Sequence, residues 1–238
     1  MWDVAGDIVL IIGSYLLGSF PYMLLRSRAR GLKVTPGEDY HIAMWHKMDH
    51  REGVIGIGVD ALKGVIPIAA GFIFDFGLAI IAIAGVAAVI GQMWPVFQKF
   101  NGEKGNTTGA GMIVTFCPFI GGGAWFVLGA GLFCFFIGSV VRTMPRFLRK
   151  GQTFHERLNF GGPVSNSLPL GMICGFAVMP LVAWLLSQPV ELTLALTATF
   201  LAIVIRRITA NLNTDLKTAR TSTTKIVVSR LLFDRSYY

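Results

Sequence analysis

Charged residues are scarce in this chain. Asp, Glu, Lys and Arg make up 14% of its 238 residues, against about 25% in soluble globular domains. Apolar residues make up 53% and lie in long blocks, without the spacing of amphipathic helices. The mean hydropathy is +0.62. This scarcity excludes an ordinary soluble protein and predicts one all-α membrane domain over 1–238 that crosses the bilayer several times.

Cysteine is also rare, and basic residues are missing from the first residues of the chain. Cys117, Cys134 and Cys174 all lie in apolar runs, so we expect small buried side chains and neither disulfides nor metal ligands. The N-terminal segment carries Asp3 and Asp7 but no Lys or Arg, so we expect no cleavable signal peptide. The net charge of +8 is no sign of nucleic-acid binding, because in a membrane protein the positions of the charges matter.

The apolar runs predict seven transmembrane helices. The run 109–141 decides the count, because as one helix it would be about 50 Å long at 1.5 Å per residue. That is too long for one crossing of a hydrocarbon core about 30 Å thick. Pro118 and the glycines at 121–123 mark a break within it. The predicted helices are about 7–26, 54–73, 76–98, 109–120, 124–141, 163–186 and 189–206.

The positions of the basic residues support this count. Every one of the 21 Lys and Arg residues except Lys63 lies in or beside the loops 27–53, 99–108 and 142–162 or the tail 207–238. Seven crossings place these four stretches on one side, and the opposite connections carry no Lys or Arg. Since cytoplasmic loops hold the excess of Lys and Arg, we predict an outside N-terminus, a cytoplasmic C-terminus and a location in the cell membrane.

A short polar loop around Lys104 is the first candidate site. Gly102, Gly105 and Gly109 surround this lysine, and an apolar run follows immediately. Glycines let backbone N–H groups converge, and a helix N-terminus and a lysine both attract an anion. The alternative is a plain interfacial turn with a solvated lysine. An aromatic belt precedes the loop, formed by Trp94, Phe97 and Phe100.

Asp60 and Lys63 are charged residues inside the second predicted helix. Their three-residue spacing places them on one helix face. Each charge there would cost about 2.5–3.5 kcal/mol on an insertion scale. We therefore expect an ion pair that faces the bundle interior or a polar cavity. Such a pair either joins two helices or takes part in function.

Three further polar groups have alternative interpretations. Ser19, next to Gly18 and before Pro21, suits either close helix packing or a site. The segment 165–169, Ser-Asn-Ser-Leu-Pro, is either a helix cap or a set of donors at the membrane surface. The histidines of the first loop fit no standard metal spacing, so we expect no metal and favour a solvated loop; they are His41, His46 and His50.

Together these motifs resemble the bacterial integral-membrane glycerol-3-phosphate acyltransferases that use acyl phosphate. Gly18-Ser19-Phe20-Pro21 resembles the Gly-Ser-x-Pro of that family, and Asp60-Ala61-Leu62-Lys63-Gly64 resembles its Asp-x-x-Lys-Gly. The family's Gly-His-x-Phe-Pro and Phe-x-Gly-Gly-Lys-Gly correspond to Gly91-Gln92-Met93-Trp94-Pro95 and Phe100-Asn101-Gly102-Glu103-Lys104-Gly105. Ser165-Asn166-Ser167-Leu168 resembles its Ser-Ser-Leu, and Asn211 its last-helix Asn.

The chain also departs from the family pattern. The motif Ser-Gly-Asn-x-Gly-x-x-Asn should fall near 37–45, where its Ser and both Asn are replaced. The family's histidine after Gly91 is Gln92, and Ile208 stands three residues before Asn211 where a histidine is expected. The chain is therefore either a divergent branch with changed chemistry or a fold retained without this activity.

The resemblance implies acyl transfer from acyl phosphate to glycerol 3-phosphate, which yields lysophosphatidic acid for phospholipid synthesis. It implies seven helices, cytoplasmic motifs, contact with membrane lipids, no cofactor and no nucleic acid. The general base would be the donor phosphate or a loop group such as His46 or Asp39. The implied catalytic residues are Lys104, Asp60, Ser165 and Asn211. The implied substrate-binding residues are Gly102, Gly105, Asn106, Thr107, Thr108, Lys63, Ser19, Gln92, Ser167, Arg51 and His46.

Two other functions stay open at this point. The altered first motif suits a non-catalytic membrane protein that binds lipid or acyl phosphate. The charged pair at membrane depth suits a small transporter, although such proteins often contain internal repeats. We find no repeat, and the polar motifs gather on one side of the predicted membrane domain. This arrangement favours an interfacial enzyme or binding protein.

Overall fold

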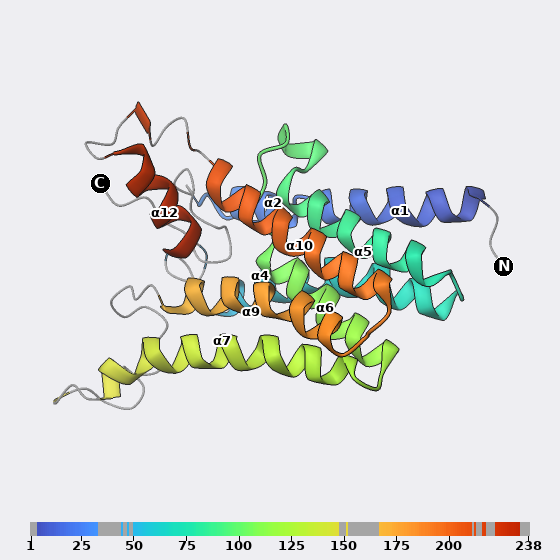
Figure 1. Ribbon diagram of the computed structural model, residues 1–238. Helices are drawn as coiled ribbons and strands as arrows, with labels where there is room; N and C mark the ends of the chain where they lie inside the picture. The colour runs from blue at the N-terminus through green and yellow to red at the C-terminus, as the bar shows by residue number, and fades with distance from the viewer. Residues whose placement is uncertain are drawn as a thin grey trace.

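The computed structural model describes residues 4–32, 44, 47, 50–147, 151, 167–210, 212, 216–217 and 222–233. All regular secondary structure in these ranges is helical, and the long helices lie side by side in a bundle (Figure 1). The elements are α1 (Val4–Ser19), α2 (Tyr22–Ala29), α4 (His50–Ile73), α5 (Leu78–Met93), the 3-10 turn η1 (Val96–Gln98), α6 (Asn106–Ile120), α7 (Ala124–Phe147), α9 (Ser167–Leu185), α10 (Val190–Thr209) and α12 (Thr223–Phe233).

Five segments are long and apolar enough to cross a membrane: Val4–Ala29, Arg51–Ile73, Leu78–Gln98, Ala124–Val141 and Val190–Thr209. Pro169–Leu185 is a shorter apolar helix. α6 is also short, and its 15 residues span about 22 Å at 1.5 Å per residue. The structure thus supports a multi-pass membrane protein. The count of seven crossings and the side on which each terminus lies stay predictions.

The run 109–141 is divided between two helices, α6 and α7, which meet at the glycine turn 121–123. The observed helices extend beyond the predicted ones, since α6 begins at Asn106 and α7 ends at Phe147. The first predicted helix is interrupted at Phe20 and Pro21, which separate α1 from α2. Pro21 lacks the N–H that would continue the helix.

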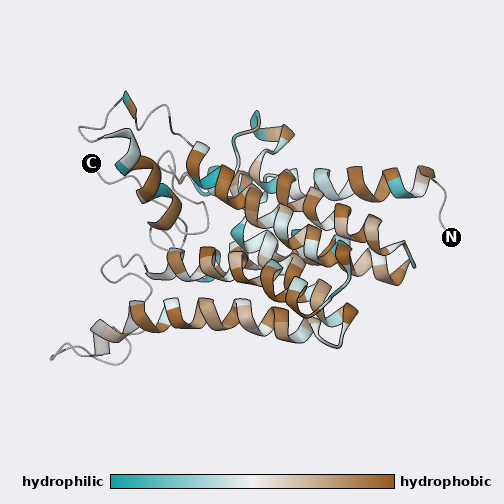
Figure 2. Cartoon of the chain, viewed as in Figure 1, coloured by the Kyte–Doolittle hydropathy of each residue, from teal (hydrophilic) through white to brown (hydrophobic). Residues whose placement is uncertain are grey.

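The surface of the bundle is apolar, as contact with lipid requires. Hydrophobic residues follow the helices along their length (Figure 2). On α7, several large apolar side chains are exposed, among them Trp125, Phe126, Phe133 and Phe136. A buried apolar cluster lies between the central helices; it includes Met93, Met112, Phe116, Phe176 and Leu196.

The connections 74–77, 121–123 and 186–189 lie at the end of the bundle that carries the N-terminus, and α12 lies at the other end (Figure 1). The segment 94–105 between α5 and α6 therefore belongs to the end opposite the N-terminus. The start of α4 and the end of α10 lie at this same end. Residues far apart in the sequence can thus meet around the Lys104 loop.

Two glycines bring α4 and α6 unusually close. A Cβ atom added at Gly64 would lie 2.0 Å from the Thr108 carbonyl oxygen, and one added at Gly111 would lie 2.1 Å from that of Ala61. Only glycine therefore fits at either position. This contact fixes the first turn of α6 against α4 at the level of Asp60.

The C-terminal helix α12 packs against the ends of α9 and α10 through two buried arginines. Arg207 Nη1 donates to the carbonyl oxygens of Pro169 and Leu231, each at 3.2 Å. Arg230 Nη1 donates to the Ile208 oxygen at 3.0 Å and to the Ala210 oxygen. Arg230 thereby satisfies carbonyl groups that the end of α10 would otherwise leave without partners.

Candidate active site

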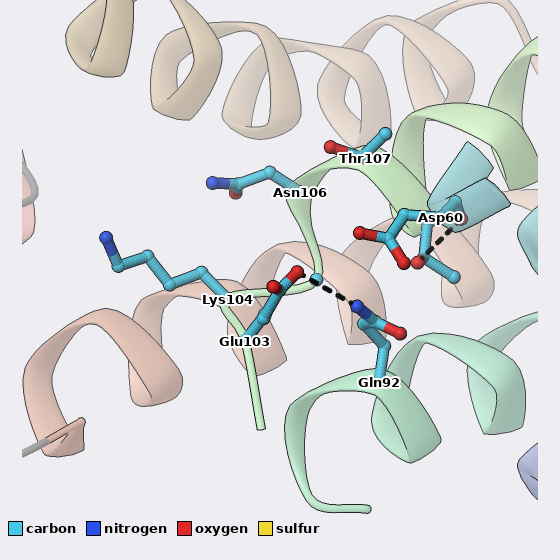
Figure 3. A pocket seen from close by; sticks show the side chains of 8 residues that line it. Asp60, Gln92, Glu103, Lys104, Asn106 and Thr107 are labelled. Carbon is cyan, nitrogen blue, oxygen red and sulfur yellow. Dashed lines mark hydrogen bonds between the residues drawn. The ribbon is translucent and has the colours of Figure 1, made fainter. Parts of the chain in front are cut away.

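A small polar pocket opens at the junction of α4, α5, the 99–105 loop and α6 (Figure 3). Its cavity volume is about 20 Å³, room for about one water molecule. A ligand can therefore place only part of its polar head there, and a long apolar chain would have to lie outside it. The lining residues are Asp60, Gln92, Glu103, Lys104, Gly105, Asn106, Thr107 and Thr108.

The 99–105 loop delivers Lys104 to the N-terminus of α6. Gly105 precedes the first helical residue, Asn106, in a left-handed conformation with φ +71°. A Cβ atom there would also lie 2.6 Å from Met93 Cε, so glycine is required by both backbone and packing. The N–H groups of a first helical turn lack intrahelical partners, and together with a lysine they favour an anion.

One wall of the pocket is a chain of polar contacts that links three elements. Lys63 Nζ lies 3.0 Å from Asp60 Oδ1 and donates to Gln92 Oε1 at 2.5 Å. Gln92 Nε2 donates to Glu103 Oε2 at 3.1 Å. The amide of Gln92 thus presents its oxygen to the ammonium group and its nitrogen to the carboxylate. The ion pair predicted between Asp60 and Lys63 is confirmed, since it is buried and faces the bundle interior.

Asp60 is the most strongly desolvated charged group of this wall, with 1% of its surface exposed. Its Oδ1 lies close to Lys63 without hydrogen-bond geometry, and its Oδ2 has no hydrogen-bond partner among the described residues. Burial of a carboxylate without donors is costly. Asp60 therefore retains capacity to accept a hydrogen bond from a ligand or to share a proton with a neighbour.

Arg206 of α10 holds the loop from the other side. Its Nη2 donates to Asn101 Oδ1 at 2.9 Å and to the Gly102 carbonyl oxygen at 2.5 Å, and its Nε donates to the Glu103 carbonyl oxygen at 3.4 Å. The guanidinium carbon also lies 6.0 Å from the centre of the Trp94 ring, within the range of a cation–π contact. The loop conformation thus depends on a residue about a hundred positions further along the chain.

The pocket gathers many of the residues named from the sequence. Lys104, Asp60, Gly105, Asn106, Thr107, Thr108 and Gln92 all line it. Lys63 contacts two of these lining residues, Asp60 and Gln92. Gly102 packs against the Gln92 carbonyl and Pro95. The Thr108 hydroxyl donates to the Asp60 backbone oxygen at 2.9 Å, so it holds α6 against α4 and is no ready donor to a ligand.

The remaining predicted site residues are not among the described residues that line the pocket. Ser19 is fully buried in the contact between α1 and α5, where its N atom would lie 3.0 Å from a Cβ at Gly91. Its small size serves helix packing, and the substrate contact expected for it stays a prediction. Arg51 is an exposed residue of the first turn of α4, and Ser167 is the first residue of α9. Ser165, Asn211 and His46 lie outside the described residues.

Sequence reasoning missed two residues that shape the site, Glu103 and Arg206. Glu103 replaces the second glycine of the Gly-Gly-Lys-Gly pattern, and this departure from the pattern could have identified it from the sequence. Arg206 lies at the end of a hydrophobic helix, a common place for a basic residue in a membrane protein. Nothing in the local sequence indicates that it contacts the loop.

A family model for glycerol-3-phosphate acyltransferase matches residues 8–148, which is more than half of the chain. The chain belongs to the glycerol-3-phosphate acyltransferase family. Relatives of that name include proteins of Geotalea daltonii and Rubrobacter xylanophilus. The first is 33% identical over 118 residues, which cover 48% of this chain and 61% of the relative. The second is 32% identical over 155 residues, which cover 61% of this chain and 78% of the relative.

The fold also matches solved structures of PlsY (YgiH), an integral membrane glycerol 3-phosphate acyltransferase. The glycerol 3-phosphate form superimposes with a TM-score of 0.64 at 22% identity, covering 93% of this chain and 98% of that one. The lysophosphatidic acid form superimposes with a TM-score of 0.62 at 22% identity, covering 94% of this chain and 98% of that one. The likeness covers nearly the whole chain, whereas the family model ends at residue 148.

Within the glycerol-3-phosphate acyltransferase family pattern given above, Gln92 and Glu103 are two departures, and they contact each other. Gln92 stands where that pattern has histidine, and Glu103 where it has glycine. The hydrogen bond between them joins α5 to the loop that carries Lys104. The two differences thus form one local alteration of the pocket wall.

Proposed function

We propose that this chain is an acyl-phosphate-dependent glycerol-3-phosphate acyltransferase of the cell membrane, which makes lysophosphatidic acid. The main support is the position of Lys104, which lines a pocket at the N-terminus of α6 in a bundle of apolar helices. A fatty acyl phosphate combines a long apolar chain with a compact anionic head. The chain can lie along the helices while the head contacts the polar residues that line the pocket.

The reaction needs positioning and charge stabilisation, because acyl phosphate is already activated. The acceptor hydroxyl oxygen attacks the acyl carbon, the bond between that carbon and the phosphate oxygen breaks, and inorganic phosphate leaves. Lys104 and the first-turn N–H groups of α6 would bind the phosphate and stabilise the negative charge that grows on it. Alignment of the two substrates supplies the rest of the rate enhancement.

The second phosphate, that of the acceptor, requires another cation at the same end of the bundle. We assign it to Arg51, which is exposed in the first turn of α4. Lys63, which contacts Asp60 and Gln92, is the alternative. Arg206 holds the loop. Asp60 orients Lys63, and Ser165, Ser167, Asn211 and His46 stay predicted contributors.

The test is an acyltransferase assay on purified protein in lipid, with palmitoyl phosphate and labelled glycerol 3-phosphate. We expect lysophosphatidic acid from the wild type and at least about a 100-fold loss in Lys104→Ala, because a charge-stabilising donor contributes about 10²–10³ in rate. Lys225→Ala, on an exposed position of α12, is the matched control.

Turnover by Lys104→Ala at the wild-type rate would disprove the function given to this lysine. A folded wild type that binds palmitoyl phosphate without forming product would instead indicate a binding protein.

A further inference from the structure

The last turn of α10 joins the loop that carries Lys104 to the C-terminal helix α12, which packs against α9 and α10 (Figure 1). Two adjacent arginines make this connection, because successive residues of a helix point about 100° apart. Arg206 donates to the loop. The buried Arg207 donates instead to the backbone oxygens of Pro169, at the start of α9, and of Leu231 in α12.

Arg230 of α12 makes the same kind of contact in the opposite direction. Its Nη1 donates to the backbone oxygens of Arg207 at 3.4 Å and Ile208 at 3.0 Å, and also to that of Ala210. The last carbonyl groups of a helix lack intrahelical partners, and a cation at this end is also favoured by the helix dipole. Each helix thus presents an arginine to the backbone of the other, and the two hold each other in place.

The contact between α12 and the end of α10 is buried. Arg230 is 7% exposed, and Ile226, one turn earlier in α12, is 2% exposed. A buried guanidinium group is costly unless its N–H groups find acceptors. If α12 moved along α10, these arginines would lose the carbonyl groups that they now contact. The interface therefore specifies the position of the last turn of α10, which includes Arg206.

The pocket itself is lined by residues of α4, α5, the 99–105 loop and α6. We propose that α12 serves catalysis from outside the pocket, with Arg230 as a positioning residue that fixes the end of α10 so that Arg206 holds the loop. This rests on the proposed acyl transfer. The position of the loop matters because Lys104 must lie where charge develops on the phosphate, and a displacement of about 1 Å can cost about 100-fold in rate.

The decisive experiment is a double-mutant cycle of Arg230→Met and Arg206→Met, measured as kcat/KM in the acyltransferase assay. Arg230→Met keeps an apolar stem and removes the donors to the end of α10. We expect it to lower kcat/KM about tenfold, which matches the loss of about one hydrogen bond of a charged group. In the Arg206→Met background it should change kcat/KM by less than about twofold, because the contact through which it acts is already gone.

Hydrogen exchange provides a readout that does not depend on turnover. The 102–105 amides should exchange faster in Arg230→Met than in the wild type, while the amides of α5 keep their wild-type rates. Lys225→Met removes a positive charge from an exposed position of the same helix and should change neither exchange nor kcat/KM. Ile226→Ala loosens α12 without removing a charge and should reproduce both effects. Should Arg230→Met fail to fold, the same cycle with Ile226→Ala decides.

Wild-type kcat/KM and wild-type exchange in Arg230→Met would overturn the proposal. The same tenfold loss in both backgrounds would also overturn it, because the effect would then be independent of Arg206. A wild type without product would overturn the proposed function alone, since exchange at 102–105 would still decide whether α12 positions the loop.

Discussion

Replacing Arg206 with methionine should detach the 99–105 loop from α10 while preserving the aliphatic part of the side chain. The guanidinium group donates to Asn101, to Gly102 and, at 3.4 Å, to Glu103. Hydrogen bonds of a charged group contribute about 1.5–3 kcal/mol each, and the contact with Trp94 adds about 0.5–1 kcal/mol. Because such terms are not additive, we expect about 3 kcal/mol of loop stabilisation to be lost.

This loss of loop stability should lower catalytic activity without unfolding the whole protein. A penalty of about 3 kcal/mol corresponds to roughly a 100-fold lower kcat/KM, since each 1.36 kcal/mol is tenfold. Arg206→Lys should recover little of it, because an ammonium group lacks the planar fork that reaches several acceptors. Hydrogen exchange at the 102–105 amides should accelerate in both variants.

The exposed position Lys225 provides the control, because Lys225→Met removes a positive charge without touching the loop. Wild-type kcat/KM and unchanged amide exchange in Arg206→Met would refute the assignment of Arg206 as the residue that orders this loop.

Three other substitutions test the geometry. Gly64→Ala should force α4 and α6 apart at the Thr108 carbonyl, lowering stability by about 1–3 kcal/mol and abolishing activity; thermal unfolding and the assay would report both. Gly105→Ala should cost about 1–2 kcal/mol in the left-handed conformation and reduce kcat/KM more than the melting temperature. Glu52→Gln should reduce stability by about 1–2 kcal/mol, because it weakens two ion pairs, with Arg26 and Arg30, that are each worth up to about 1 kcal/mol when the arginines are partly exposed; an unchanged unfolding midpoint would contradict this estimate.

Features set by neighbouring residues were predictable from the sequence. The helix break at 121–123, the ion pair of Asp60 and Lys63, and the glycine loop before α6 all involve partners within a few positions of each other. Their geometry follows from the rise of the helix and from backbone sterics. The resemblance to the acyltransferase family relied on the same short motifs, and the family model agrees with it.

The contacts that complete the site required the tertiary structure. Arg206 and Asn101 are 105 residues apart, and the wall of Lys63, Gln92 and Glu103 joins three elements. Ser19, expected at the site, is buried between α1 and α5. The physical reason is that hydrophobic residues surround a membrane helix on every side, since lipid is as apolar as the protein interior. Hydropathy therefore locates such a helix, but only its packing decides which face turns toward its neighbours.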